Sequence, residues 1–275
     1  YFLDTKYQEE DYKKAMEDLM IQYQQETGAK VYIYRLPNVF GKWSKPNYNS
    51  VVATFCFNIA RGLDIHVHNP EKELMLCYID DVLEEFLGAL NGIPTVQGNY
   101  CVVPESHTIY LGELADLITS FEHSRNNLSI ANMDDALTKK LYSTYLSFLP
   151  EDNFLYDLKM NIDSRGSFTE FIRTQNRGQI SVNVSKPGII KGNHWHQTKN
   201  EKFLVVSGEA LIRFRKVESN DIIEYRVSGE KLQVVDIPTG YTHAIVNVGD
   251  TDLVTVIWVN ECFDPVKPDT YYLEV

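Results

Sequence analysis

The chain has 275 residues, which is enough for about two domains at ~100–200 residues each. Its formal net charge of −12 argues against nucleic acid as a partner, because contact with phosphates requires a basic surface. No apolar run approaches the ~18 residues that a membrane span needs, and the first residues lack the apolar core of a signal peptide. We therefore expect a cytoplasmic protein with no membrane span.

The first half of the chain alternates between helical and strand-like patterns. Apolar residues recur at helical spacing in several segments, and short β-branched or aromatic runs lie between them. This alternation is typical of an α/β domain. The patterns predict helices at 9–27, 50–61, 78–92, 110–121 and 134–148, and strands at 31–36 and 63–68.

The pattern changes after Pro150, where short β-rich runs are separated by Gly, Asn, Asp and Pro. No long helical period follows, so this half is predicted to be an all-β sandwich or small barrel. We place the domains at 1–149 and 150–275. The predicted strands are FTEFIR, QISVNVS, KFLVVSG, ALIRFRKV, IIEYRVS, QVVDIP, HAIVNVG and LVTVIWV. The four widely spaced cysteines indicate reduced, buried thiols rather than disulfides.

One stretch of the second half, GNHWHQTKNEKFLVVSG, carries metal-ligand chemistry. His194 and His196 point to the same face of a strand because they are two residues apart. Glu201 follows after a polar turn and comes close to them if the chain doubles back. Two imidazoles and a carboxylate suit zinc, nickel, iron or manganese, and zinc is the simplest choice if no redox chemistry occurs.

A further histidine, His243, follows a Pro-Gly turn in PTGYTHAIVN. Together with the preceding stretch, this spacing resembles the two motifs of the cupin family. That resemblance implies a jelly-roll barrel in which His194, His196, Glu201 and His243 hold one divalent metal. The alternative is that these histidines are hydrogen-bonded structural residues. The pair His66 and His68 also has the H-x-H spacing, but no further ligand follows it, and we expect no metal there.

The stretch NIDSRGSFTEFIR resembles the D-x-R-G-x-F-x-E segment of the nucleotide-sugar 3,5-epimerases, which are also cupins. The resemblance implies that Arg165, Phe168 and Glu170 bind the substrate, with the guanidinium on a diphosphate. Lys191 and Tyr241 flank the motifs and are the candidate acid–base pair. Both residues could equally lie at the rim of the barrel.

In the first half, VYIYRLPNVFGKW resembles the R-x-x-N-x-(Y/F)-G stretch of extended short-chain dehydrogenase/reductases, and CYIDDV resembles a later segment of that family. Arg35 and Asn38 are the matching substrate-binding candidates. A partial Rossmann-type reductase domain followed by a cupin resembles the CapF family of capsular polysaccharide enzymes. The resemblance implies a UDP-linked 4-keto-6-deoxy amino sugar, UDP-2-acetamido-2,6-dideoxy-hexos-4-ulose, as substrate. It also implies that the cupin would epimerise carbon 3 and that the reductase domain would reduce the 4-keto group with NADPH to UDP-N-acetyl-6-deoxytalosamine.

The chain departs from that family pattern at its start. No G-x-x-G-x-x-G turn, which would bring backbone amides to the pyrophosphate of NADPH, occurs in the sequence. Lys13 matches the lysine of the family's Y-x-x-x-K motif, but Glu9 stands at the tyrosine position. We therefore expect these 275 residues to lack the reduction and to retain exchange of the carbon-3 proton.

Two other functions stay open from the sequence. The cupin could be a non-catalytic module that binds a sugar nucleotide or joins two subunits. It could also be an iron-dependent dioxygenase. In each case a homodimer is expected, because pairing can bury the edges of a jelly roll.

Overall fold

The computed structural model describes residues 2–174 and 176–275, with side chains from residue 12 onward. The chain divides into two compact units. The first comprises residues 1–121 and 133–150, and the second comprises 122–132 and 151–275.

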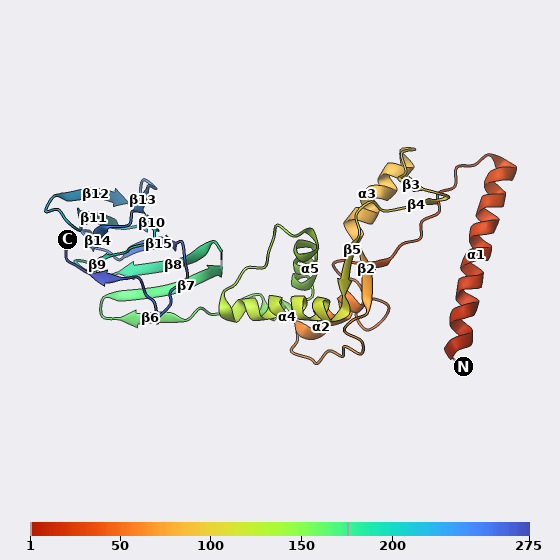
Figure 1. Ribbon diagram of the computed structural model, residues 1–275, viewed down its shortest axis with the longest axis horizontal. Coiled ribbons are helices and arrows are strands. Elements are labelled where there is room, and N and C mark those ends of the chain that lie inside the picture. The colour runs from red at the N-terminus through yellow and green to blue at the C-terminus, as the bar shows by residue number, and fades with distance from the viewer. Residues whose placement is uncertain (1, 175) are drawn as a thin grey trace. The chain divides into compact units, whose positions relative to one another are not determined.

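The first unit combines helices with two small sheets (Figure 1). Strand β1 pairs in parallel with β2, and β2 pairs antiparallel with β5, while β3 and β4 form a separate hairpin. This is the α/β organisation that the sequence predicted. The helices are α1 (Phe2–Thr27), α2 (Val51–Ile59), α3 (Ile79–Leu90), α4 (Leu111–Asn127) and α5 (Ala136–Leu146), and the strands are β1 (Asn38–Phe40), β2 (Glu73–Tyr78), β3 (Val96–Gln97), β4 (Tyr100–Cys101) and β5 (His107–Tyr110).

Local chemistry accounts for where these helices begin. Ser50 caps α2 by accepting from the amide of Ala53 at 3.2 Å, and Asp135 caps α5 by accepting from Thr138 at 2.7 Å. The acidic first turn of α3 complements the positive end of the helix dipole. Apolar side chains from β1, β2, α2, α4 and α5 form the core: Phe40, Val52, Cys56, Leu76, Leu114, Ile118, Phe121, Leu141 and Tyr145.

Two predicted strands of this unit are wrong. Residues 31–36 run extended but form only an isolated bridge from Tyr34 to Cys101, and the nearest strand, β1, begins at Asn38. Residues 63–68 form no strand, and the His66 and His68 rings lie 6.4 Å apart on that irregular segment. In both segments the alternation of apolar residues is present, but no neighbouring strand pairs along it.

The second unit contains two sheets, of six and five strands, and a short 3-10 helix (Glu151–Asn153). One sheet has the order β13-β10-β15-β8-β7-β6, and the other has the order β12-β11-β14-β9-β16. The strands are β6 (Met160–Asp163), β7 (Gly166–Thr174), β8 (Gly178–Ser185), β9 (Ile190–Trp195), β10 (Glu201–Ser207), β11 (Glu209–Lys216), β12 (Ile222–Ser228), β13 (Val234–Ile237), β14 (Tyr241–Asn247), β15 (Leu253–Val259) and β16 (Tyr271–Tyr272).

The core of this unit is built from the facing sides of both sheets, as a barrel requires. Phe203 and Val205 come from β10, while Ile212 and Phe214 come from β11, and all are at most 5% exposed. The predicted all-β jelly roll of the cupin class is confirmed.

A bulge in β9 decides which of its side chains face the barrel interior. His194 pairs with His243, and Lys191 pairs with Ile245, so the register shifts by one residue at Asn193. Asn193 has φ 56°, in the left-handed region that asparagine tolerates. Because of this extra residue, Lys191 and His194 both lie on the inner face although they are three residues apart.

Among the described residues, no helix is both long and apolar enough to cross a bilayer. All four cysteines are free thiols. Cys56, Cys77 and Cys101 are buried as predicted, whereas Cys262 is only partly buried.

Candidate metal centre

Four side chains from three strands converge inside the second unit. His194 and His196 come from β9 and the residue after it, Glu201 begins β10, and His243 lies in β14. One potential ligand atom from each residue lies within 4.8 Å of the corresponding atoms of the others. The structure thus brings together all four of the ligands expected from the sequence.

The ligand atoms are buried and mostly unpartnered. The Glu201 Oε2 atom lies 3.1 Å from His243 Nε2 and 3.7 Å from His196 Nε2. Neither contact has the geometry of a hydrogen bond, so all three atoms lack a hydrogen-bond partner. Buried polar atoms are normally hydrogen-bonded, so an orphaned set around one point fits a divalent cation.

The protonation states of these residues suit a cation as well. Burial lowers the pKa of the His194 imidazole to about 4, so this ring is neutral at neutral pH. Burial opposes the charge on Glu201 most strongly, but the imidazoles of His196 and His243 together outweigh it and lower the carboxyl pKa to about 2. Burial also opposes protonation of His196, yet the Glu201 carboxylate raises its pKa overall. A metal ion bound there would take the place of that proton.

Lys191 lies on the same inner face, but its ammonium group is already engaged. Its Nζ donates to Asn183 Oδ1 at 2.7 Å and to the Val184 carbonyl at 2.9 Å, with the Ser167 carbonyl at 3.5 Å. These acceptors are neutral, so the positive charge is held without a contacting anion. Burial lowers the pKa of Lys191. The three acceptors hold the protonated ammonium group in place, whereas burial acts in the opposite direction and makes its proton easier to lose.

A pocket of about 530 Å³ opens beside Lys191. Arg165 and Phe168 line it, together with Asn161, Asp163 and Asn183. Three of the residues expected to act on substrate, Lys191, Arg165 and Phe168, therefore share one cavity. Glu170 is not among its lining residues and instead lies 3.5 Å from Arg173.

The turn that carries Arg165 is fixed by the Asp163 side chain and by a close backbone contact at Gly166. Asp163 accepts from the Arg165 amide at 2.8 Å and pairs with its guanidinium at 2.6 Å. Gly166 follows with φ 135°, and a Cβ there would lie 2.0 Å from the Val184 carbonyl oxygen. Only glycine fits this close approach of β7 to β8. The Arg165 side chain is 59% exposed at the rim of the pocket, where an anion could compete with Asp163 for the guanidinium.

Tyr241 begins β14 two residues before His243 and therefore points to the same inner face. It is partly buried and packs against the core cluster of the barrel. The position is compatible with contact between its phenol and a ligand in the barrel.

In the first unit, the expected substrate residues have structural partners. Arg35 forms a two-point pair with Glu17, at 2.7 and 2.9 Å, and its guanidinium stacks 4.0 Å above the Tyr100 ring. Asn38 donates to the Met75 carbonyl at 3.1 Å and so ties β1 to β2. Lys13 lies exposed on α1. The side chain of Glu9 lies outside the described part of the chain.

A cluster of two carboxylates and one histidine in the first unit resembles a metal site only in its residue types. Asp81, Glu105 and His107 bring their ligand atoms together. However, Lys140 Nζ lies between them, 2.7 Å from Asp81, 2.6 Å from Glu105 and 3.4 Å from His107. The ammonium group already supplies the positive charge that this cluster needs.

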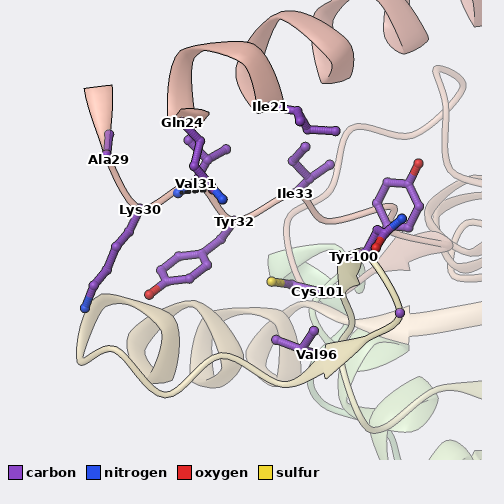
Figure 2. Close-up of a pocket in the computed structure, with 13 residues that line it drawn as sticks. Ile21, Gln24, Ala29, Lys30, Val31, Tyr32, Ile33, Val96, Tyr100 and Cys101 are labelled. Carbon is purple, nitrogen blue, oxygen red and sulfur yellow. Dashed lines mark hydrogen bonds between the residues drawn. The ribbon is translucent and has the colours of Figure 1, made fainter. Parts of the chain in front are cut away.

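Figure 2 shows a larger pocket of about 800 Å³ in the first unit. Its walls come from the last turns of α1, the segment 28–33 and the β3–β4 hairpin, and include Lys30, Tyr32 and Tyr100. None of the site residues expected from the sequence lines it.

Sequence reasoning missed one residue beside the centre, Asp269. Its carbonyl oxygen lies 2.5 Å from His196 Nδ1. Burial opposes the charge on its carboxylate most strongly, but the amides of residues 197–199 outweigh burial and lower the pKa to about 2. No pattern in the sequence connects it to a histidine 73 residues away.

Comparisons with known proteins agree with these observations. Residues 161–271 match the polysaccharide biosynthesis C-terminal domain family, and residues 7–99 match the NAD dependent epimerase/dehydratase family. A UDP-2-acetamido-2,6-beta-L-arabino-hexul-4-ose reductase from Pseudomonas aeruginosa is 45% identical over 263 residues, which cover 96% of this chain and 70% of the relative. A spore coat polysaccharide biosynthesis protein, SpsL from Bacillus subtilis, is 25% identical over 122 residues, covering 41% of this chain and 81% of its own.

Solved structures give the same assignment across both units. The capsular polysaccharide assembling protein CapF from Staphylococcus aureus is 59% identical, with a TM-score of 0.92, over 94% of this chain and 76% of that chain. The identity of the relatives and the share of their length that is covered confirm the expected resemblance. This chain belongs to the CapF family of capsular polysaccharide enzymes.

Proposed function

We propose that the second unit is a metal-dependent epimerase that exchanges the carbon-3 proton of a UDP-linked 4-keto-6-deoxy amino sugar in capsule synthesis. The observation that carries this proposal is the convergence of ligand atoms from His194, His196, Glu201 and His243. Buried atoms of the last three residues have no hydrogen-bond partner. The substrate class is proposed from the Pseudomonas relative, which is named as the reductase of a UDP-linked hexul-4-ose, a 4-ketosugar.

The reaction requires removal of a proton next to a carbonyl group. Negative charge then develops on the keto oxygen, and a fixed positive environment lowers the barrier. A divalent metal, which we propose to be zinc, would supply Lewis-acid stabilisation at this point. The lowered pKa values of His194 and Glu201 favour a neutral imidazole and an ionised carboxylate at neutral pH. These are the forms in which both groups bind a metal.

Side chains of the protein would then stabilise charge, transfer the proton and bind the nucleotide. Lys191 holds a positive charge at the pocket wall, since its donors are directed at Asn183 and the β8 backbone. Tyr241 is the proposed proton-transfer group, because its hydroxyl can both donate and accept. Arg165 and Phe168 form the rim that receives the nucleotide end of the substrate.

The proposal is confined to the unit in which the candidate centre lies. The family's NADPH-dependent reduction is a separate step on the same 4-ketosugar. An exchange assay without NADPH keeps the two steps apart, and NADPH oxidation measured separately reports on reduction by these 275 residues.

The test incubates metal-loaded protein with the UDP-4-ketosugar in deuterated water and follows deuterium at carbon 3 by NMR. We expect exchange by the wild type, loss of exchange after metal removal, and restoration when zinc is returned. Tyr241→Phe should retain metal but lose exchange by about 10²-fold or more, the usual contribution of a general acid or base. Binding of the sugar nucleotide by metal-loaded wild type without any exchange would contradict the proposal and indicate a non-catalytic binding module.

A further inference from the structure

The C-terminal residues contact His196, the strands that carry His194 and His243, and the loop that leads to Glu201. Tyr272 pairs with His194 and Tyr271 pairs with Trp195, so β16 extends the sheet beyond β9. The Tyr271 and Trp195 rings stack with centroids 4.8 Å apart. Residues 264–275, here called the C-terminal strap, are therefore bound directly to the strand that carries two of the histidines.

The strap also contacts the strand of the third histidine. Thr242, which precedes His243, donates its hydroxyl to the carbonyl of Leu273. The Leu273 amide in turn donates to the carbonyl of Asn193, the bulge residue, at 2.9 Å. One strap residue thus connects β14 to the β9 bulge that aims His194 into the barrel.

Asp269 makes the most extensive of these contacts. Its Oδ1 accepts from the Gln197 amide at 3.1 Å, and its Oδ2 accepts from the amides of Thr198 and Lys199, each at 2.9 Å. The Thr198 hydroxyl adds a contact to Oδ2 at 3.1 Å. These donors belong to the loop that joins His196 to Glu201, so one carboxylate fixes the path between two ligands.

The backbone of the same residue orients one ligand directly. A carbonyl oxygen only accepts hydrogen bonds, so the 2.5 Å contact between the Asp269 carbonyl and His196 Nδ1 requires the proton to be on Nδ1. The lone pair of His196 is then on Nε2, the atom that lies toward Glu201. Asp269 has φ 41°, a left-handed conformation that aspartate and asparagine tolerate better than most residues.

We propose that Asp269 is the positioning residue of the metal centre, through which the C-terminal strap sets the tautomer of His196 and the spacing between His196 and Glu201. This inference rests on the proposed metal centre but not on the epimerase reaction. Partners of ligating histidines typically contribute about 10- to 100-fold to metal affinity. The strap therefore tunes metal retention without supplying a ligand.

The test compares wild type with Asp269→Ala, Asp269→Asn and Asp264→Ala. Asp264 lies in the same strap, but its Oδ1 accepts only from the nearby Val266 amide, at 2.8 Å, among the contacts described, so this variant is the matched control. Each full-length protein is stripped with a chelator, and its zinc dissociation constant is measured by competition with a chromophoric chelator. Asp269→Ala keeps the backbone carbonyl but removes the carboxylate that fixes residues 197–199 and disfavours the left-handed backbone that aims the carbonyl at His196. We therefore expect it to weaken zinc binding about tenfold or more. Asp269→Asn keeps one side-chain oxygen as an acceptor and tolerates the left-handed backbone. Its zinc affinity should therefore lie between those of Asp269→Ala and the wild type.

A second readout separates positioning from general destabilisation. Thermal unfolding of each variant is measured with and without zinc, because at a given concentration a ligand raises Tm more when it binds the folded state more tightly. Positioning predicts that the zinc-induced rise in Tm shrinks in Asp269→Ala and not in Asp264→Ala. Wild-type zinc affinity in Asp269→Ala, or an equal loss in Asp264→Ala, would overturn the inference. A wild type that binds no zinc would instead overturn the metal centre on which the proposed function rests.

Discussion

Lys191 and Tyr241 both face the interior of the barrel, but their surroundings give them different capacities. Lys191 reaches β8 and donates to the Asn183 side chain and the Val184 carbonyl. Giving up its proton would break at least one of these bonds inside a partly buried site. Tyr241 begins a strand at the edge of the core cluster. We therefore propose the acid–base role for Tyr241 and an electrostatic role for Lys191.

A buried carboxylate in the first unit allows a prediction about pH. Glu85 is 7% exposed and accepts at 2.7 Å from the Tyr34 hydroxyl, the Thr95 amide and the Thr95 hydroxyl. Burial opposes its charge most strongly, but these bonds outweigh burial and lower its pKa. A lowered folded-state pKa contributes stability above the unfolded carboxyl pKa of about 4.3, and that stability is lost as the pH falls through the folded-state value.

We expect Glu85→Gln to reduce the free energy of unfolding by about 1–2 kcal/mol at pH 7, since bonds to a charged acceptor are replaced by weaker ones. The difference between variant and wild type should shrink below about pH 4, where the wild-type carboxylate begins to be protonated. Urea unfolding across this pH range measures both effects. Glu84→Gln, an exposed neighbour on α3, should change stability by less than about 0.5 kcal/mol. A difference that stays constant down to pH 3 would contradict the assignment.

At the scale of elements, prediction from sequence succeeded where a segment pairs along its length. The β-rich runs of the second unit became strands because each has a neighbour in one of the two sheets. Residues 31–36 have the same apolar character, yet only Tyr34 forms a bridge. A sequence pattern reports that one face of a segment is apolar, but it does not report whether a partner strand is present.

In the candidate site, too, some residues could be predicted from the sequence and others could not. His194, His196, Glu201 and His243 were predictable because strand periodicity and a Pro-Gly turn fix their directions. Asp269 was not, because its partners lie about 70 residues earlier and the contact involves a backbone carbonyl. The bulge that turns Lys191 inward also leaves no residue-type signal apart from an asparagine after a glycine.

At the scale of the whole molecule, we propose that the chain is a homodimer joined through its second unit. Edge strand β6 has one unpaired side and exposes Met160 and Ile162, the latter 71% accessible. An unpaired edge with apolar side chains favours association, and burying this surface would stabilise a pair of chains.

Sedimentation velocity at micromolar concentration should give twice the chain mass of 31.7 kDa. Ile162→Lys should shift the protein toward the monomer, because charged side chains protect exposed edges from pairing. Leu155→Lys is the control, since Leu155 is 81% exposed but lies outside the strands. A wild type that sediments as a monomer would contradict the dimer, and an equal effect of both substitutions would contradict the role of β6.

The most direct test of the account is the metal content of the purified protein, measured by elemental analysis alongside that of His243→Ala. The four converging ligand atoms predict about one equivalent of a divalent metal, with zinc expected, in the wild type. His243→Ala removes a ligand from the interior of the site, so its metal content should fall well below one equivalent. A wild type that carries no metal after loading with zinc and dialysis would contradict a metal centre at these residues. A His243→Ala protein that retains a full equivalent would contradict it as well.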